Sequence, residues 1–454
     1  MNSCWKRRKG YALGGLVAVL LGMGRAEAAI SGGGELFGEE TVERVAQNSG
    51  SPEADRLLEE GWQLYQQGTA ESLRRAFEKW EEARRLYREA GIQFGEAAIL
   101  FGLGRAYEDF GNKLEALDHY EQALSLVQTI EDLPTEANIL EAAILNNIAV
   151  VYNALGNRQQ ELNHYEQALP IFQAIGDPVR EAMILNNIGL AYSELGQQKK
   201  ALSCYDQALS LLEAVGDRPG EATTLSNMGL AYSRLGDKLE ALNQYESALL
   251  IIQAAGDRFT EAGILNNIGG IYSDVGDNQK ALEKYSQALI LFQSLKDQSG
   301  VATALSNIGN IYHALGDNHT ALDYYEQALP LRREVGDRSG EATTLSNMGL
   351  AYSILGEQQT ALDYYEQAWS LSKEVGDLSG EVSTLNNIGI VYGALGEKQK
   401  ALDYFNQALP LTQALRDPSL EATTLNNLGG IHSELGENQT ALDQYKDTSI
   451  NSLF

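Results

Sequence analysis

A forty-residue period runs through most of this chain and constrains its fold more than any other feature. The unit at residues 181–220 returns with almost no drift, so that Asn187 has a counterpart in each regular copy. Tyr192 returns in the same way, except that His432 takes its place in the last copy. Self-similarity at a fixed period of this length predicts a stack of like supersecondary units instead of one closed globule.

Each unit has the pattern of two helices joined by a short turn. In the first helix, apolar residues fall on one face at Ile184, Leu185, Ile188, Tyr192 and Leu195. The second helix carries a similar stripe at Ala201, Tyr205, Ala208, Leu209, Leu212 and Val215. Gly216 predicts the end of the second helix, because glycine tolerates the left-handed conformation. Lys296 and Arg416 replace that glycine in two copies, so we expect looser helix ends there.

A glycine recurs in the middle of the first helix, at Gly189 and its counterparts. Glycine costs roughly 1 kcal/mol against alanine inside a helix, so its return predicts a close helix approach that offsets this cost. On the second helix, Ala201 and Ala208 lie two turns apart on the face that carries Tyr205. Small residues that face a large aromatic ring predict two helices that interlock at about 8–10 Å.

These residues carry a family resemblance. The pattern Leu-x-Asn-x-Gly-x-x-Tyr-x-x-Leu-Gly, followed by Ala-Leu-x-x-Tyr-x-x-Ala-Leu, resembles the tetratricopeptide repeat over residues 53–447. The forty-residue period is similar to the subtype found in kinesin light chains and in the Leu-Gly-Asn-repeat polarity proteins. The resemblance implies an all-α solenoid, a right-handed superhelix of about ten helix-turn-helix units. It also implies that the concave face binds peptides or proteins.

Residues 1–28 have the order of segments that is typical of a secretory signal peptide. Basic residues at 6–9 precede an apolar run from Tyr11 to Met23, and Ala26-Glu27-Ala28 follows. We expect cleavage after Ala28, and hence a secreted or periplasmic protein. The apolar run is shorter than a comfortable membrane span of roughly 20 residues, and an uncleaved N-terminal anchor is the alternative.

The remaining chain divides by the regularity of its repeats. Residues 29–52 are rich in glycine, serine and acids and are predicted to form a flexible linker. Residues 53–130 hold degenerate units, the first of which we interpret as a terminal cap that has lost the recurring asparagine and glycine. Five extra residues then precede the regular array at 135–447 and should lengthen either the loop or the next helix. The last second helix leaves the pattern after Tyr445, which indicates a truncated unit.

The chain carries 34 basic and 62 acidic side chains, a formal net charge of −28. Such a surface repels nucleic acid phosphate and anionic membrane, so we expect no nucleic-acid partner. It is compatible with a neutral-to-basic protein segment as partner, but the favoured interpretation is that the charge only keeps a long rod soluble. We expect no membrane span in the mature chain, because the only long apolar run lies in the signal segment.

The recurring asparagines are the strongest candidates for a binding site. In tetratricopeptide domains the matching residue faces the concave groove, where its amide hydrogen-bonds the main chain of a ligand. An amide offers both a donor and an acceptor, so it pairs with an extended backbone of any sequence. A purely structural role, in which each asparagine bridges neighbouring helices, is equally open. The predicted peptide-binding residues are Asn147, Asn187, Asn227, Asn267, Asn307, Asn347, Asn387 and Asn427, with Asn186, Asn266, Asn310 and Asn386 beside them.

The residues around these asparagines are neutral polar or aliphatic. The cations that clamp a C-terminal carboxylate in the chaperone-binding subtype are absent from these positions, which favours an internal, extended segment as the ligand. A second feature is an aromatic residue at one position of three successive second helices, at Tyr324, Tyr364 and Tyr404. These rings could stack as a stripe, but partial burial between repeats is the favoured interpretation.

The sequence gives no support for catalysis. The five histidines are scattered, and no Cys, His or carboxylate set has the spacing of metal ligands or of a nucleophile motif, so neither a cofactor nor an enzymatic activity is predicted. The acidic residues follow the repeat and are interpreted as solvated helix faces and loop caps.

The favoured function is a non-catalytic scaffold that binds an extended segment of a partner protein. One alternative is a structural rod that self-associates through Leu425, Leu428 and Leu435 of the unfinished last unit. The other is the regulatory repeat region of a truncated caspase-like protease, because proteins with such repeats resemble fusions to a protease domain of that kind.

Overall fold

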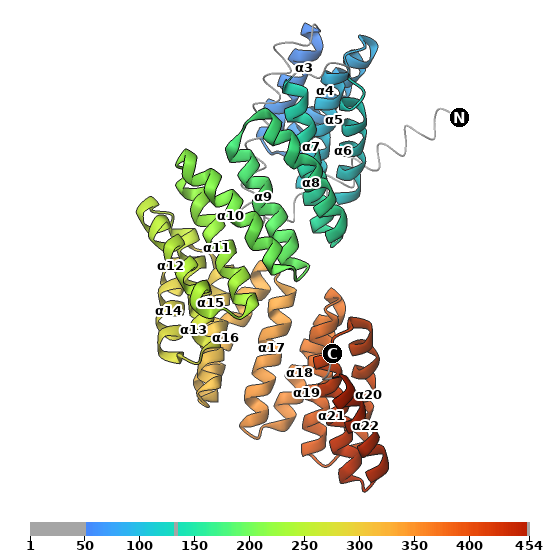
Figure 1. The fold of residues 1–454 in the computed structure, drawn as a ribbon. Helices are drawn as coiled ribbons and strands as arrows, with labels where there is room; N and C mark the ends of the chain where they lie inside the picture. The colour runs from blue at the N-terminus through green and yellow to red at the C-terminus, as the bar shows by residue number, and fades with distance from the viewer. Residues whose placement is uncertain (1–50, 131–134, 452–454) are drawn as a thin grey trace, which may run out of the picture. The chain divides into compact units, whose positions relative to one another are not determined.

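The structure is a computed structural model that describes residues 51–130 and 135–451. Within these residues every regular element is an α-helix, and the helices follow one another in pairs from α3 to α22 (Figure 1). The all-α solenoid of helix pairs that the repeat predicts is thereby confirmed. The predicted signal peptide at 1–28 and the predicted linker up to residue 50 lie outside the described residues.

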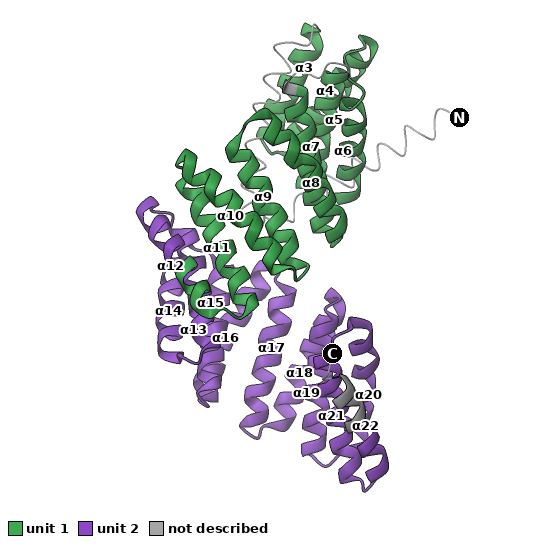
Figure 2. Ribbon diagram, in the orientation of Figure 1, with its two compact units in different colours: residues 1–244 green, residues 245–454 purple. Residues whose placement is uncertain are grey.

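The chain divides into two compact units, residues 1–244 and residues 245–454 (Figure 2). Helix α12 (Lys238–Ala255) contains the division. The helices of the first unit are α3 (Pro52–Gln66), α4 (Ala70–Glu89), α5 (Gln93–Asp109), α6 (Lys113–Val127), α7 (Thr135–Ala154), α8 (Arg158–Ile175), α9 (Pro178–Glu194), α10 (Gln198–Val215) and α11 (Arg218–Leu235). Those of the second unit are α13 (Arg258–Asp274), α14 (Asn278–Leu295), α15 (Gln298–Ala314), α16 (Asn318–Val335), α17 (Arg338–Ile354), α18 (Gln358–Val375), α19 (Leu378–Ala394), α20 (Lys398–Leu415), α21 (Pro418–Glu434) and α22 (Asn438–Asn451).

A glycine on the first helix and an aromatic ring on the second hold the helices of a pair together. A Cβ added at Gly189 would lie 2.4 Å from Tyr205 Cε1, and one added at Gly309 would lie 2.6 Å from Tyr325 Cε1. The two rings are each only 1% exposed. The predicted close approach is confirmed, and burial of a large ring offsets the cost of a glycine inside a helix.

The first helix pair also has this glycine–ring contact, although the sequence pattern predicts that this pair has lost the recurring glycine. Gly61 on α3 faces Trp80 on α4, and an added Cβ would lie 2.5 Å from Trp80 Cδ1. Gly61 precedes its ring by 19 residues, whereas Gly189 precedes Tyr205 by 16, so the forty-residue register hides the match. The terminal unit therefore uses a larger ring in the same joint.

Most second helices end in a left-handed glycine, and the lysine and arginine that replace it in two regular repeats have the same geometry. Lys296 has φ 58° and Arg416 has φ 55°. After these two residues, Asp297 N donates to Phe292 O at 3.0 Å and Asp417 N donates to Thr412 O at 3.4 Å. After a glycine the same bond has similar lengths, 3.0 Å at Asp217 N and 3.4 Å at Asp177 N. The prediction of looser ends is therefore wrong. The hydrogen-bonded turn persists even though a side chain in this conformation costs about 1–2 kcal/mol.

Acidic residues join one pair to the next. Asp217 accepts a hydrogen bond from Gly220 N at 3.1 Å and so caps α11, which confirms the interpretation as a loop cap. At the start of the first helices, however, several glutamates are 3–5% exposed, so they are not solvated: Glu221, Glu261 and Glu341. Glu341 accepts from Arg333 Nε at 2.6 Å, across the loop from α16. A buried, paired carboxylate thus ties a first helix to the preceding second helix.

Within each unit the first helices approach one another more closely than the second helices do. Helix α13 contacts α15, α15 contacts α17 and α17 contacts α19, and in the first unit α5 contacts α7 and α9 contacts α11. No two second helices within a unit make a comparable contact in the described part of the chain. A stack in which one row of helices is in mutual contact curves toward that row. The first helices therefore line the inner side of each unit.

The insert and the last unit differ locally from the regular pairs. Helix α7 has 20 residues, compared with 17 in α9, and begins three residues earlier in the register. Part of the insert therefore extends this helix, whereas residues 131–134 lie outside the description. Helix α22 has 14 residues, compared with 18 in α20. The division into degenerate units at 53–130 and a regular array at 135–447 stays a prediction.

Two of the three leucines that were predicted to drive self-association are buried in the last helix pair. Leu425 is 5% exposed and Leu428 is 1% exposed, and Leu428 packs with Phe405 of the preceding pair. Leu435 alone of the three is exposed, at 42%. The apolar surface expected at this end is therefore smaller than the sequence indicated.

Replacing Gly189 by alanine should destabilise the protein, because the added methyl group lies 2.4 Å from Tyr205 Cε1. Overpacking of this kind lowers the free energy of unfolding by about 1–3 kcal/mol. Gly102 is the matched control, since it lies inside α5 with no atom within 4 Å of an added Cβ. Gly102→Ala should stabilise by about 0.5–1 kcal/mol. Urea denaturation followed by circular dichroism measures both, and equal effects would contradict the interlock.

Candidate functional site

The glycine–tyrosine joint determines where the recurring asparagines point. We call the eight residues Asn147, Asn187, Asn227, Asn267, Asn307, Asn347, Asn387 and Asn427 the asparagine row. Each precedes by two residues the position equivalent to Gly189, which faces Tyr205, and this position is glycine except at Ala149. Two residues correspond to about 200° around a helix, so an asparagine of the row points away from its second helix. The row therefore lies toward the inner side of each unit.

Exposure varies along the row and among the asparagines beside it. Asn147 is 7% exposed, and Asn146 and Asn386 are 4% and 5% exposed. Asn267 and Asn310 are exposed. The other members of the row are half-buried, as are Asn186 and Asn266. The predicted site residues thus share the first helices, but they do not present one uniformly open surface.

Amide-to-amide hydrogen bonds tie parts of the row to the neighbouring first helix. Asn307 Nδ2 donates to Asn266 Oδ1 at 2.9 Å, and Asn427 Nδ2 donates to Asn386 Oδ1 at 3.2 Å. In the first unit the same bond is long: Asn187 Nδ2 lies 3.5 Å from Asn146 Oδ1. Each bond joins the first helices of two successive pairs. For these members the structural role that the sequence left open is realised.

Other amides of this group have different partners. Asn147 Nδ2 donates to the hydroxyl of Tyr120 at 3.3 Å. Asn347 Nδ2 donates at 3.0 Å to Asn310 Oδ1, which also accepts from the Tyr325 hydroxyl at 2.7 Å. These bonds hold Asn147, Asn310 and Asn347 in place within the stack.

Asn186 interrupts this series of amide-to-amide hydrogen bonds between first helices, which we call the amide ladder. Its Nδ2 donates to Thr224 Oγ1 at 2.9 Å on the next first helix. Its Oδ1 is buried without a hydrogen-bond partner, and the following row member, Asn227, does not donate to it. Leaving a buried acceptor unsatisfied costs about 1–3 kcal/mol, so this position is a weak point of the ladder.

Three members of the row make no side-chain hydrogen bond to the described residues: Asn227, Asn267 and Asn387. Asn387 lacks a partner because Ser346 stands one repeat earlier, where an asparagine would supply the ladder acceptor. Serine at this place is too short to repeat the bond, and Ser306 donates instead to Ala302 O of its own helix at 2.9 Å. Asn347 also follows a serine, Ser306, but it is tied by a different acceptor, Asn310 Oδ1.

The surface around the row is neutral and partly apolar, as the sequence indicates. Leu350 and Ile390 follow the row by three residues and are 36% and 50% exposed. The guanidinium of Arg234 donates to Ser193 Oγ at 2.8 Å, so this nearby base is engaged with the preceding pair. An extended main chain could satisfy the free amides while its side chains contact the aliphatic residues.

The tyrosines proposed as a stripe are arranged differently. Tyr324, Tyr364 and Tyr404 are half-buried, in line with the favoured interpretation. They stack within their own repeats instead of on one another, each on the tyrosine of the first helix: Tyr312, Tyr352 and Tyr392. The sequence contained the signal for this pairing, because the two tyrosines of a repeat are always 12 residues apart.

Among the described residues, no three His, Cys, Asp or Glu side chains are grouped so that they could hold a metal ion. None of the described helices combines the length and the apolar character that a membrane crossing requires.

A protein-family model described as Tetratricopeptide repeat matches residues 140–214, 180–254, 260–334, 300–374, 340–414 and 380–449. A second model with the same description matches residues 72–129. These matches together cover more than half of the chain. No match was found among curated proteins.

Several solved structures are similar to this chain. The apo form of the quorum sensor NprR from B. thuringiensis has a TM-score of 0.55 and 17% identity, covering 81% of this chain and 99% of that chain. A Rap protein complexed with Competence and Sporulation Factor has a TM-score of 0.53 and 14% identity, covering 84% of this chain and 98% of that chain. A kinesin light chain-type protein with nearly identical repeats from Podosopora anserina has a TM-score of 0.38 and 16% identity, covering 44% of this chain and 97% of that chain. At these identities the likeness concerns the fold alone.

A double-mutant cycle on Asn266 and Asn307 should reveal the ladder bond. We expect a coupling energy of about 0.5–1.5 kcal/mol between Asn266→Ala and Asn307→Ala, because Asn307 Nδ2 donates to Asn266 Oδ1 at 2.9 Å. Asn267→Ala serves as control and should change stability by less than about 0.5 kcal/mol, since this amide is exposed and untied. Thermal denaturation of the four proteins gives the cycle. Strictly additive effects would show that the bond contributes nothing.

Proposed function

The chain belongs to the tetratricopeptide repeat family, and we propose that it is a non-catalytic scaffold that holds an extended segment of a partner protein along its asparagine row. The observation that carries this proposal is the set of untied amides at Asn227, Asn267 and Asn387, on helices that line the inner side of each unit. A side-chain amide that donates and accepts in the plane of a peptide group matches an extended main chain irrespective of its sequence.

The chemistry of the surroundings defines the kind of segment. The residues beside the row are neutral or aliphatic, and the chain as a whole has a formal net charge of −28. An acidic segment would be repelled by this field, whereas a neutral or basic one would be attracted to it. We therefore propose a neutral-to-basic, internal segment as the ligand.

Two similar folds support a binding role. One solved relative in fold is described as a quorum sensor, and another was solved in complex with Competence and Sporulation Factor. The same type of helix-pair stack thus serves recognition in those proteins. Nothing in that likeness identifies the partner of this chain, which we define here only by its chemistry.

We further propose that the protein acts outside the cytoplasm. The support is the order of basic, apolar and small residues at 1–28, which is typical of a cleaved signal peptide. The uncleaved form would be an N-terminal anchor. The first residue of the exported protein distinguishes the two, because cleavage after Ala28 leaves Ala29 at the N-terminus.

The proposed function can be tested with an array of acetylated and amidated peptides. Neutral-to-basic peptides should bind the full chain. Replacing both Asn267 and Asn387 by alanine should then weaken binding about ten-fold, because each lost amide–main-chain hydrogen bond removes about 0.5–1.5 kcal/mol. Fluorescence anisotropy with the best array peptide measures the change.

The matched control removes asparagines from the opposite side of the repeats. Asn163 and Asn406 are exposed on the second helices α8 and α20, so their joint replacement by alanine should leave the affinity unchanged. Binding restricted to acidic peptides with a free C-terminus would refute the proposed ligand. Equal affinity of the Asn267/Asn387 variant and the unmodified chain would refute the proposed site.

A further inference from the structure

Three successive repeats of the second unit each contain a stacked pair of tyrosine rings. The centroids of Tyr312 and Tyr324 are 5.5 Å apart with an interplanar angle of 9°, and those of Tyr352 and Tyr364 are 5.3 Å apart at 7°. The third pair, whose centroids are 5.4 Å apart, repeats this geometry at Tyr392 and Tyr404. All six rings are half-buried, so their remaining edges and faces reach the surface.

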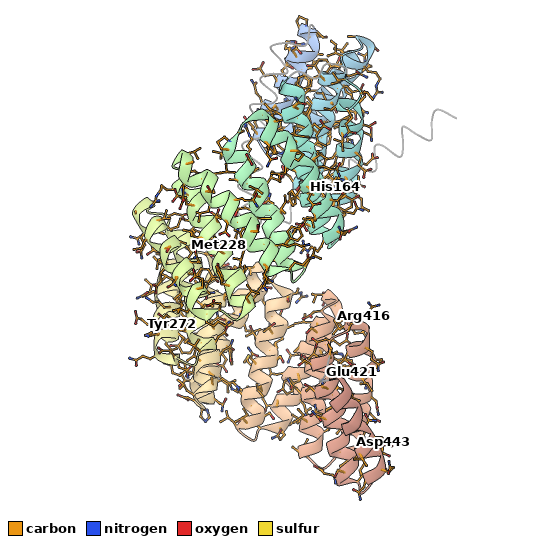
Figure 3. All side chains as sticks on the ribbon, in the orientation of Figure 1. His164, Met228, Tyr272, Arg416, Glu421 and Asp443 are labelled. Atoms are coloured by element: carbon orange, nitrogen blue, oxygen red, sulfur yellow. The ribbon has the colours of Figure 1, made fainter. Side chains whose placement is uncertain are left out.

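In three repeats, among them the one with Tyr392 and Tyr404, a lysine of the same chain lies over the first-helix tyrosine. Lys280 Nζ is 5.0 Å from the ring centroid of Tyr272, which is labelled in Figure 3, and Lys400 Nζ is 4.9 Å from that of Tyr392. Lys400 shows that a ring already stacked on a second tyrosine still accepts the ammonium group. A cation in this position is attracted by the negative face of the ring.

A carboxylate completes the environment of Lys280 and Lys400, whereas Lys200, which lies over Tyr192, has Gln197 at this place. Lys280 Nζ lies 3.1 Å from Asp277 Oδ2, and Lys400 Nζ lies 2.5 Å from Glu397 Oε2. The acid and the lysine are three residues apart at the start of the second helix. Ring face and carboxylate thus act together on one ammonium group.

The two repeats between these lysines have the ring and the acid but threonine in place of the lysine. Thr320 Oγ1 donates to Asp317 Oδ2 at 2.7 Å. Thr360 Oγ1 lies 3.5 Å from Glu357 Oε2. A hydroxyl group carries no charge, so these two carboxylates and the tyrosine faces beside them have no lysine of their own repeat.

We propose that these two repeats dock a lysine-bearing segment of a partner protein. The docking surface, which we call the tyrosine–carboxylate surface, consists of Tyr312, Tyr324, Asp317, Tyr352, Tyr364 and Glu357. The partner's lysines would take the positions that Lys280 and Lys400 take in their own repeats. The internal lysines are the argument for this occupant, because they show which group the same constellation binds when the chain supplies it.

The electrostatics of the surface agree with a cationic occupant. Burial raises the pKa of Tyr352 above its usual range, and the neighbouring Tyr364 and the negative charges of Glu326 and Glu357 raise it further. The same charges attract a cation. Tyr312, Tyr352 and Tyr364 pack against one buried cluster, so the two halves of the surface are adjacent.

This surface is separate from the asparagine row. The first-helix tyrosine follows the row asparagine by five residues, as Tyr312 follows Asn307, which corresponds to a rotation of about 140° around the helix. A partner can therefore occupy one surface without the other. The proposal goes beyond the binding of a main chain by amides, and either can fail while the other holds.

The test uses the full chain with 13C-labelled tyrosine rings and a defined peptide. The peptide is acetylated and amidated, contains glycine and serine, and carries lysines four residues apart, because side chains four residues apart in an extended chain point to the same side and are separated by about 13 Å. Titration should shift the resonances of Tyr312, Tyr324, Tyr352 and Tyr364, assigned from tyrosine-to-phenylalanine variants. A peptide with glutamine in place of lysine should leave them unchanged.

A pair of charge-matched variants isolates the docking surface. Thr320→Lys with Thr360→Lys restores the lysine seen in other repeats and should weaken peptide binding at least about five-fold. Gln327→Lys with Gln367→Lys adds the same charge at exposed positions of the same helices and should change affinity less than about two-fold. Circular dichroism verifies that both variants keep their helicity. Equal weakening in the two variants, equal shifts with the glutamine peptide, or no shift with the lysine peptide would overturn the proposal.

Discussion

The structure depends on the close contact between a glycine of one helix and an aromatic ring of the next. At Gly309 and Tyr325 the ring occupies the space that any other residue would need for its Cβ. This contact fixes the rotation of the first helix relative to the second. Once the glycine faces the ring, the asparagine two residues earlier has to face the other way. A packing requirement inside each pair therefore produces the row of amides on the inner side of each unit.

Contacts between pairs then determine which amides are available. Where one repeat supplies an acceptor such as Asn266, the next row member is tied to it. Where serine stands instead, as at Ser346, Asn387 has no partner among the described residues. The same set of side chains thus contributes both to stability and to the proposed recognition. We infer that the free amides on the first helices suit a ligand that is recognised mainly through its main chain.

The sequence predicts the fold well, because the fold is repeated in the sequence. The periodicity predicted helix pairs, and the glycines predicted the close approach that Tyr205 and Gly189 make. The resemblance to tetratricopeptide repeats also placed the asparagines on the first helices. Gly61 escaped notice because its distance to Trp80 along the chain differs from the regular spacing.

The candidate site could be predicted only in outline. Which amide is tied depends on side-chain rotamers, as when Asn186 turns to Thr224 and leaves its own oxygen unpaired. The burial of Glu341 likewise accompanies its contact with Arg333 of the preceding pair, which the pattern of acids in one repeat does not reveal. These features depend on contacts between repeats, whereas a periodic pattern describes one repeat at a time.

The most direct test of this account is a crystal structure of the protein with a bound neutral-to-basic peptide. The account predicts a peptide main chain within hydrogen-bond distance of the side-chain amides of Asn267 and Asn387, along the first helices of the second unit. A peptide bound only to the second helices, with both of these amides facing solvent, would contradict it.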